Sequence, residues 1–228
     1  MAGSPLLRPV WHALTTSQAA FALGAGKARR YLPEIGPLAG MADDSDASLA
    51  DLAALLGTSD DEVWSVQSTA HDTPEGCEAI WQRDLVLMTF VGDGAPDAAA
   101  HAAIPLTAAH AEEMYALAML TKPGPFGLRT AELGRYWGII EDGRLVAMAG
   151  ERMQFPGFCE ISGVATHPDF RGRGFAQMLM ALKLREVLAR EEIPFLHSYA
   201  DNAGAIALYE RIGFSIAHGM TVTAYRRA

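Results

Sequence analysis

The chain has 228 residues, of which 50% are hydrophobic and 20% charged, a composition ordinary for a soluble globular protein with room for one large domain or two small ones. It contains neither an apolar run near the ~20 residues of a membrane-spanning helix nor the basic and apolar regions of a secretory signal. The net charge of −9 arises in residues 1–100, which hold 5 Lys and Arg against 14 Asp and Glu, whereas residues 101–228 hold 13 of each; this acidity argues against nucleic acid as a partner.

The first 100 residues predict short helices and strands joined by irregular segments. In chain order, we expect a helix within residues 11–23, a helix that Ser48 caps and that runs to Leu56, and strands at residues 63–66 and 85–91. Glycine, proline and aspartate then dominate residues 92–97, which is typical of a linker. We therefore place a domain boundary near residue 100, between an acidic α/β segment at 1–100 and a second unit at 101–228.

The second unit predicts a regular alternation of elements. In chain order, these are a strand at 104–106, a helix at 107–120, a hairpin over 135–150, a strand at 158–166, a helix at 174–189, a strand at 194–199, a helix at 203–211 and a last strand or hairpin at 214–226. The Asp142–Gly143 pair is a strong signal for the hairpin turn. The Pro- and Gly-rich loop at 123–127 is either a lid or a simple connection that ends the preceding helix.

A glycine-rich turn is the most informative local feature. Residues 164–176 predict a strand, a turn rich in arginine and glycine, and the start of a helix. Such a turn leaves backbone N–H groups unpaired at a helix N-terminus, which favours a phosphate or pyrophosphate. No Gly-Lys-Ser/Thr follows the glycines, so the turn is not the phosphate loop of a nucleotide-hydrolysing enzyme.

The cysteines and histidines predict no metal site. Cys77 and Cys159 are far apart in the chain and belong to no Cys-x-x-Cys or Cys/His cluster. Two free thiols in a reducing cytoplasm are the expectation, with a single disulfide as the alternative.

Two motifs closely resemble signatures of the GNAT superfamily of acyl-CoA-dependent N-acyltransferases. The family's Gln/Arg-x-x-Gly-x-Gly/Ala loop matches Arg171-Gly172-Arg173-Gly174-Phe175-Ala176, after the strand and the His167-Pro168 pair that usually introduce it. Its Asn-x-x-Ala-x-x-x-Tyr-x-x-x-Gly-Phe end matches residues 202–214. The resemblance covers residues 104–226, and its C-terminal details are similar to the glycine N-acyltransferase-like branch.

The resemblance implies a fold and a co-substrate. The fold is α/β (α+β): a mixed, largely antiparallel, splayed sheet flanked by helices, here with an additional N-terminal α/β segment that could be a degenerate GNAT-like half. The co-substrate is acetyl-CoA or another acyl-CoA, without a metal. Its pyrophosphate would be held by Arg171, Gly172, Arg173, Gly174, Phe175 and Ala176, and its pantetheine arm by Val164, Ala165, Thr166 and Asn202. The plain alternative for Asn202 is a helix N-cap.

The resemblance also implies two catalytic residues. Glu160 matches the glutamate that many members use as general base, and its apolar strand neighbours would raise the pKa of its carboxyl. Tyr209 matches the tyrosine that protonates the leaving thiolate. The alternatives are a solvent-facing glutamate and a half-buried helix tyrosine. His197 is a weaker candidate for contact with the substrate.

We therefore expect an N-acetyltransferase that transfers an acyl group directly to a primary amine on a small molecule or peptide. A non-catalytic acyl-CoA-binding or regulatory module is the alternative. A cytoplasmic location without membrane contact is expected, and a homodimer is compatible with the sequence. The motifs do not identify the acceptor amine.

Overall fold

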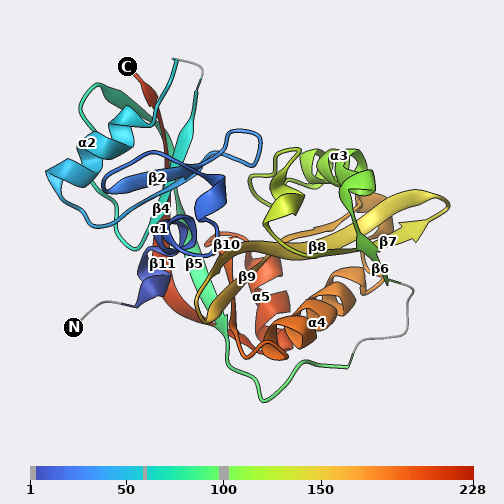
Figure 1. The fold of residues 1–228 in the computed structure, drawn as a ribbon. Coiled ribbons are helices and arrows are strands. Elements are labelled where there is room, and N and C mark those ends of the chain that lie inside the picture. Colours follow the sequence, from blue (N-terminus) through green and yellow to red (C-terminus); the bar gives the residue numbers. More distant parts are fainter. Residues whose placement is uncertain (1–3, 59–60, 98–102) are drawn as a thin grey trace.

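A computed structural model describes residues 4–58, 61–97 and 103–228, which form a mixed sheet with helices on both faces (Figure 1). The strand order is β1-β2-β3-β4-β11-β5-β10-β9-β8-β7-β6. Neighbouring strands are antiparallel except for the parallel pairs β3–β4 and β9–β10. The predicted fold class is thus confirmed.

The helices and strands have the following bounds. The α-helices are α1 (Pro9–Thr15), α2 (Asp46–Ala54), α3 (Ala111–Thr121), α4 (Phe175–Leu188) and α5 (Ala203–Ile212). The strands are β1 (Ala22–Leu23), β2 (Ala28–Tyr31), β3 (Leu38–Met41), β4 (Val63–Gln67), β5 (Cys77–Phe90), β6 (Ala103–Leu106), β7 (Tyr136–Glu141), β8 (Arg144–Phe155), β9 (Phe158–Thr166), β10 (Ile193–Tyr199) and β11 (Phe214–Arg227).

The second part of the chain follows the predicted order of elements. Asp142 and Gly143 both have positive φ angles, 51° and 73°, as the predicted two-residue turn between β7 and β8 requires. Residues 214–227 form one strand rather than a hairpin, because β11 pairs with β5 along its whole length and accommodates a bulge between Ile216 and His218.

The first part differs more from the sequence expectations. The helix predicted within residues 11–23 ends at Thr15 and is followed by a 3₁₀ turn. Strand β5 begins at Cys77 rather than at residue 85. Ser45, not Ser48, caps α2, since its Oγ accepts the backbone N–H of Ser48. The Ser48 hydroxyl is itself buried and donates to Asp43 at 2.6 Å, so it binds the loop before the helix.

A single sheet runs through both parts of the chain. β5 comes from the first part but lies between β10 and β11 of the second. The predicted boundary near residue 100 falls outside the described residues, and residues 91–97 before it contain neither helix nor strand. Contacts between the two parts are therefore built into the middle of the sheet.

The sheet opens between β9 and β10. These parallel strands pair only where residues 158–160 face residues 193–195, and they diverge beyond that point. Helix α3 lies on one face of this region, and α4 and α5 lie on the other (Figure 1). The divergence leaves a gap in the hydrogen-bonded sheet that side chains from both faces line.

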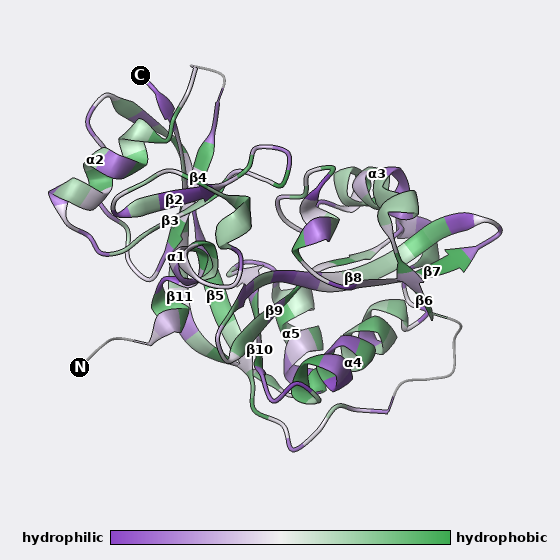
Figure 2. Ribbon diagram, viewed as in Figure 1, coloured by the Kyte–Doolittle hydropathy of each residue, from purple (hydrophilic) through white to green (hydrophobic). Residues whose placement is uncertain are grey.

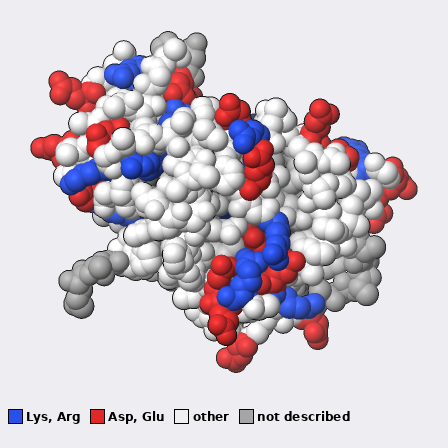
Figure 3. Space-filling view, viewed as in Figure 1, with Lys and Arg blue, Asp and Glu red and all other residues white. Residues whose placement is uncertain are grey.

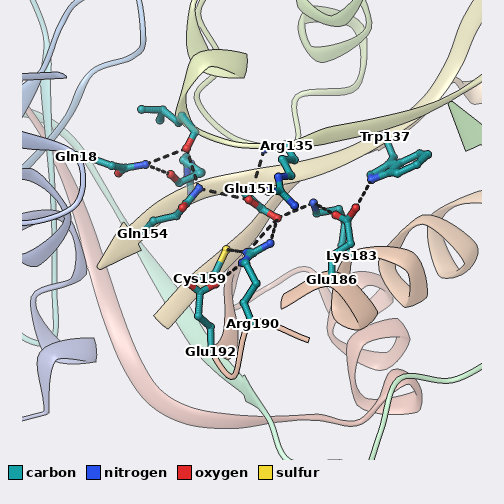
Figure 4. A network of polar contacts seen from close by, with 12 residues as sticks. Gln18, Arg135, Trp137, Glu151, Gln154, Cys159, Lys183, Glu186, Arg190 and Glu192 are labelled. Atoms are coloured by element: carbon teal, nitrogen blue, oxygen red, sulfur yellow. Dashed lines mark hydrogen bonds and ion pairs between the residues drawn. The ribbon is translucent and has the colours of Figure 1, made fainter. Parts of the chain in front are cut away.

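A buried polar network ties α4 to β8 (Figure 4). Lys183 has no exposed side-chain surface, and its Nζ donates to Glu151 Oε1 and to Glu186 Oε2, each at 2.6 Å. Arg190 adds two bonds of 3.2 Å to the same Glu151 oxygen. The hydrophilic stretch of β8 in Figure 2 marks this place in the strand. Each buried charge is paired, as burial in a protein interior requires.

The first part docks on β8 beside this network. The Gln18 side chain donates to the backbone oxygens of Arg152, at 2.6 Å, and of Leu133, at 3.2 Å. Tyr31 on β2 donates to Gln18 at 2.5 Å. These buried bonds hold the N-terminal segment against the strand that carries Arg152.

Replacing Lys183 with methionine should destabilise the protein strongly. Lys183→Met removes the cation between Glu151 and Glu186, and breaking a buried ion pair typically costs about 3 kcal/mol or more. Urea unfolding of the variant measures this loss.

Arg185→Gln is the matched control on the same helix, because Arg185 is exposed; it should change the free energy of unfolding by less than about 0.5 kcal/mol. Equal stability of Lys183→Met and the wild type would contradict the role of the network.

Candidate functional site

The glycine-rich turn after β9 has the conformation of an anion-binding loop. Gly172 and Gly174 have φ angles of 78° and 79°, and α4 begins directly after them at Phe175. A Cβ at either glycine would meet no atom within 4 Å. The positive φ, rather than crowding within the protein, therefore requires glycine here, and the space in front of the turn is open to a ligand.

The two arginines of the turn are exposed. The Arg173 guanidinium lies over the Phe170 ring, 4.6 Å from its centroid, and 4.0 Å from Glu141. The Arg171 side chain forms no hydrogen bond, ion pair or ring contact with any described residue. Together with the N–H groups at the start of α4, they fit a diphosphate outside the helix N-terminus.

A cavity of about 210 Å³ occupies the gap between β9 and β10. It brings together residues from β9, β10, α5, the loop after α3 and strands β3–β5 and β11 of the sheet. Of the residues predicted from the sequence, Val164, Asn202 and Tyr209 line it, whereas Glu160, Ala165 and Thr166 do not. Residues 123–125 of the predicted lid loop line it as well.

A bulge in β9 turns backbone toward this cavity. Ser162 faces Gly150 of β8, and Ala165 faces Met148, so two residues of β9 stand opposite one of β8. These two are Gly163, with a φ angle of 63°, and Val164. Both line the cavity, so the bulge places their backbone beside the space that a ligand could occupy.

Asn202 and Tyr209 belong to α5. Asn202 Oδ1 caps this helix by accepting the N–H of Ala205 at 3.2 Å, so the N-cap interpretation is confirmed, and the amide nitrogen remains for another partner. The Tyr209 ring is half-buried against Phe214. Burial raises the pKa of Tyr209 to about 12, which keeps the phenol protonated and able to donate.

Glu160 is enclosed rather than exposed to the cavity. Its side chain has no exposed surface, and both carboxylate oxygens are occupied: Arg152 donates from Nε at 2.8 Å and from Nη2 at 2.6 Å, and the Met153 N–H donates at 3.3 Å. Burial alone would raise the pKa of Glu160, but the charge and hydrogen bonds of Arg152, together with His197, outweigh it and lower the pKa to about 2. This differs from the raised pKa expected from its apolar neighbours.

His197 connects this buried carboxylate to the cavity. Its Nδ1 lies 2.8 Å from Glu160 Oε1, its side chain is 5% exposed, and it lines the cavity. The other ring nitrogen, Nε2, is buried and has no hydrogen-bond partner among the described residues. From the sequence, His197 is only a weaker candidate. The register that pairs Phe195 with Glu160 places His197 two residues further along the same strand face.

Other sequence features remain outside the site. Both cysteines are free, and burial raises the pKa of the Cys159 thiol. Within the described ranges, no three His, Cys, Asp or Glu side chains group as a metal site would need. No helix in the same ranges has the length and apolar character needed to cross a membrane.

Comparisons with known proteins identify similar sequences and folds. Residues 101–214 match the family model described as Acetyltransferase (GNAT) family. A GNAT-family protein from Novosphingobium aromaticivorans is 39% identical in sequence, with 99% of this chain and 100% of that chain covered and a TM-score of 0.93. No curated protein matches.

More distant structures share the fold. A GCN5-related N-acetyltransferase from Kribbella flavida is 18% identical over 93% of this chain and 91% of that chain, with a TM-score of 0.60. An acetyltransferase from the GNAT family of Colwellia psychrerythraea is 12% identical over 79% and 72%, with a TM-score of 0.53.

The lowered pKa of Glu160 predicts a pH dependence of stability. Because the carboxyl has an ordinary pKa of 4.5 when unfolded and about 2 when folded, its stabilising effect is complete above pH 4.5 and is lost as the pH falls toward 2. Urea unfolding at several pH values should show stability decreasing over this window.

Glu160→Gln should flatten that slope while lowering stability at neutral pH, since it leaves Arg152 without its partner. Glu210→Gln, at an exposed glutamate of α5, should keep the wild-type slope. If stability falls with pH in Glu160→Gln as it does in the wild type, Glu160 is not the cause of the pH dependence.

Proposed function

The chain belongs to the GNAT family of acetyltransferases, and we propose that it transfers an acetyl group from acetyl-CoA to a primary amine in the cavity between β9 and β10. Family membership supports acyl transfer from acyl-CoA. The observation that carries the finer proposal is that His197 and Tyr209, a proton acceptor and a proton donor, line one cavity in the gap of the sheet.

We propose that acyl-CoA binds from the glycine-rich turn to the cavity. The N–H groups at Arg173, Gly174, Phe175 and Ala176 and the charge of Arg171 would bind the pyrophosphate. The pantetheine arm would follow the bulged edge of β9 at Val164 and the amide of Asn202. Ala165 and Thr166 face Met148 and Ala147 of β8, so we assign them to holding the bulge and Val164 to contacting the ligand.

The transfer needs a neutral amine, a polarised carbonyl and a proton for the thiolate. The amine nitrogen attacks the thioester carbon, and the backbone N–H of Val164 stabilises the oxyanion. The C–S bond then breaks. The amine proton passes to the base, and Tyr209, whose raised pKa keeps the phenol protonated before the reaction, protonates the leaving thiolate.

We propose that Glu160 acts through His197 rather than touching the amine. A carboxyl with a pKa of about 2 is a weak base, and its oxygens are already occupied. Held by Glu160, His197 Nδ1 carries its hydrogen toward the carboxylate, which leaves Nε2 as the acceptor of the amine proton. Arg152 keeps Glu160 ionised, so the orientation of His197 is maintained.

The two parts of the chain contribute different sides of the cavity in this proposal. The N-terminal part supplies Leu38, Trp64, Val66 and Leu85 to the cavity, and we propose that residues 1–100 form the acceptor side of the enzyme and residues 101–228 its acyl-CoA side. Kinship with the glycine N-acyltransferase-like branch, a cytoplasmic location and a homodimer remain predictions.

Release of CoA from acetyl-CoA tests the proposal. Free amino acids, polyamines, aminoglycosides and peptides with free N-termini are screened with a thiol reagent. At least one amine should cause release, and Tyr209→Phe should lower kcat about tenfold or more with that amine, because general acid catalysis typically contributes about 10²–10⁴-fold.

Acetyl-CoA binding without release by any amine would instead support the binding-module alternative. Full turnover by Tyr209→Phe would remove Tyr209 as the acid.

His197→Ala should lower kcat about 10²-fold with little change in the KM for acetyl-CoA. Added imidazole should restore part of kcat, because it fits the space left by the ring and replaces the proton acceptor. His218→Ala, a histidine of β11 that does not line the cavity, serves as the control and should retain activity. A loss in His197→Ala that imidazole does not restore would indicate a purely structural role.

A further inference from the structure

The cavity differs in charge from the protein as a whole. The chain has a net charge of −9, and acidic side chains are spread over the surface drawn in Figure 3. Among the described residues that line the cavity, however, there is no Asp or Glu, and the charged ones are Lys122 and Arg152. A polycationic acceptor would therefore find no counter-charge inside it.

Arg152 retains one donor nitrogen for a ligand. Its Nε and Nη2 both donate to Glu160, whereas Nη1 makes no hydrogen bond to any described residue. Nη1 lies 3.7 Å from where a Cβ of Gly124 would be, and Gly124 lines the cavity. The guanidinium thus presents its third nitrogen to the cavity-lining loop after α3.

Lys122, in this loop, is the second cation that lines the cavity. It ends α3 in the left-handed conformation, with a φ angle of 50°. Its ammonium forms no ion pair or hydrogen bond within the described part of the chain. Glu160 balances the charge of Arg152, so the Lys122 ammonium is the cation of the described cavity lining that lacks a counter-charge, and it gives the acceptor side a positive potential.

Apolar side chains line the cavity beside these cations. They come from strands β3, β4, β5, β8 and β11, and they are Leu38, Trp64, Val66, Leu85, Met153 and Val222. An adjoining hollow shares Trp64 and Pro125 with the cavity and adds Tyr115, Phe126 and Leu128. The acceptor side therefore suits an apolar or aromatic group.

We propose that the acceptor is a primary amine that carries a carboxylate and an apolar body, as an apolar or aromatic α-amino acid does. Glu160 Oε1 lies 2.6 Å from Arg152 Nη2 and 2.8 Å from His197 Nδ1. Glu160 Oε1 thus holds His197 and Arg152 side by side. In the proposal, His197 receives the proton of the amine and Arg152 binds the carboxylate of the acceptor. An α-amino acid carries these two groups on one carbon, which matches this adjacency.

This inference rests on the proposed function, and binding of the product tests it separately from turnover. Titration calorimetry compares N-acetylphenylalanine with N-acetylphenylalaninamide, which differ in charge but contain no titrating amine. The wild type should bind the carboxylate about tenfold more tightly, the factor that corresponds to about 1.4 kcal/mol. CoA release is measured in parallel with phenylalanine, 2-phenylethylamine and spermidine.

Lys122→Asn removes the unpaired cation, and asparagine tolerates the left-handed conformation. It should reduce the preference for the carboxylate about threefold or more without abolishing CoA release. Arg185→Gln removes an exposed cation outside the cavity and should leave the preference unchanged, which separates a local effect from net charge.

The outcomes distinguish the two proposals. Equal or tighter binding of the amide, or faster CoA release with spermidine than with phenylalanine, would overturn the acceptor class while acetyl transfer stands. A preference for the carboxylate without CoA release by any amine would support the acceptor pocket and contradict the catalytic proposal.

Discussion

The buried ion pair between Arg152 and Glu160 is the interaction on which the site depends. Two charges taken out of water are costly, and this pair is tolerated because both oxygens of the carboxylate receive hydrogen bonds in good geometry. The pair joins β8 to β9 next to the point where β9 leaves β10. Glu160 also binds His197 of β10, on the other side of the gap. The carboxylate therefore joins β8 to β9 and at the same time orients His197.

β8 contributes a residue to each of two buried ion pairs, one on each face of the sheet. Glu151 and Arg152 are adjacent, and their side chains take opposite directions, as in any strand. Glu151 binds Lys183 of α4, the helix that begins at the glycine-rich turn, while Arg152 binds Glu160. The backbone oxygen of Arg152 in addition accepts Gln18 from the first part of the chain. The glycine-rich turn, the proposed proton relay and the N-terminal segment are thus positioned from two consecutive residues.

The sequence predicts best what depends on nearby residues. The turn at Asp142–Gly143, the glycines at 172 and 174 and the cap at Asn202 are local, because each is determined by the φ angle or hydrogen bond of a few residues. The insertion of β5 between β10 and β11 depends on pairings across more than 100 residues, which no local pattern contains. The lowered pKa of Glu160 escaped prediction because no local pattern shows that Arg152 and His197, on the two neighbouring strands, bind its carboxylate.

The acyl donor and the acceptor differ in how local their proposed contacts are in the sequence. The proposed contacts to acyl-CoA lie within residues 164–176 and 202–209, so two short motifs contain nearly all of them. The proposed acceptor side combines β3, β4 and β5 with the loop after α3 and with β8 and β11. Its apolar character and its positive charge come from segments that meet only in the folded sheet. With the proposed acceptor side, specificity can change through substitutions in the N-terminal part while the acyl-CoA motifs stay the same. The charge of the cavity lining is then a better guide to the acceptor than the net charge of the chain.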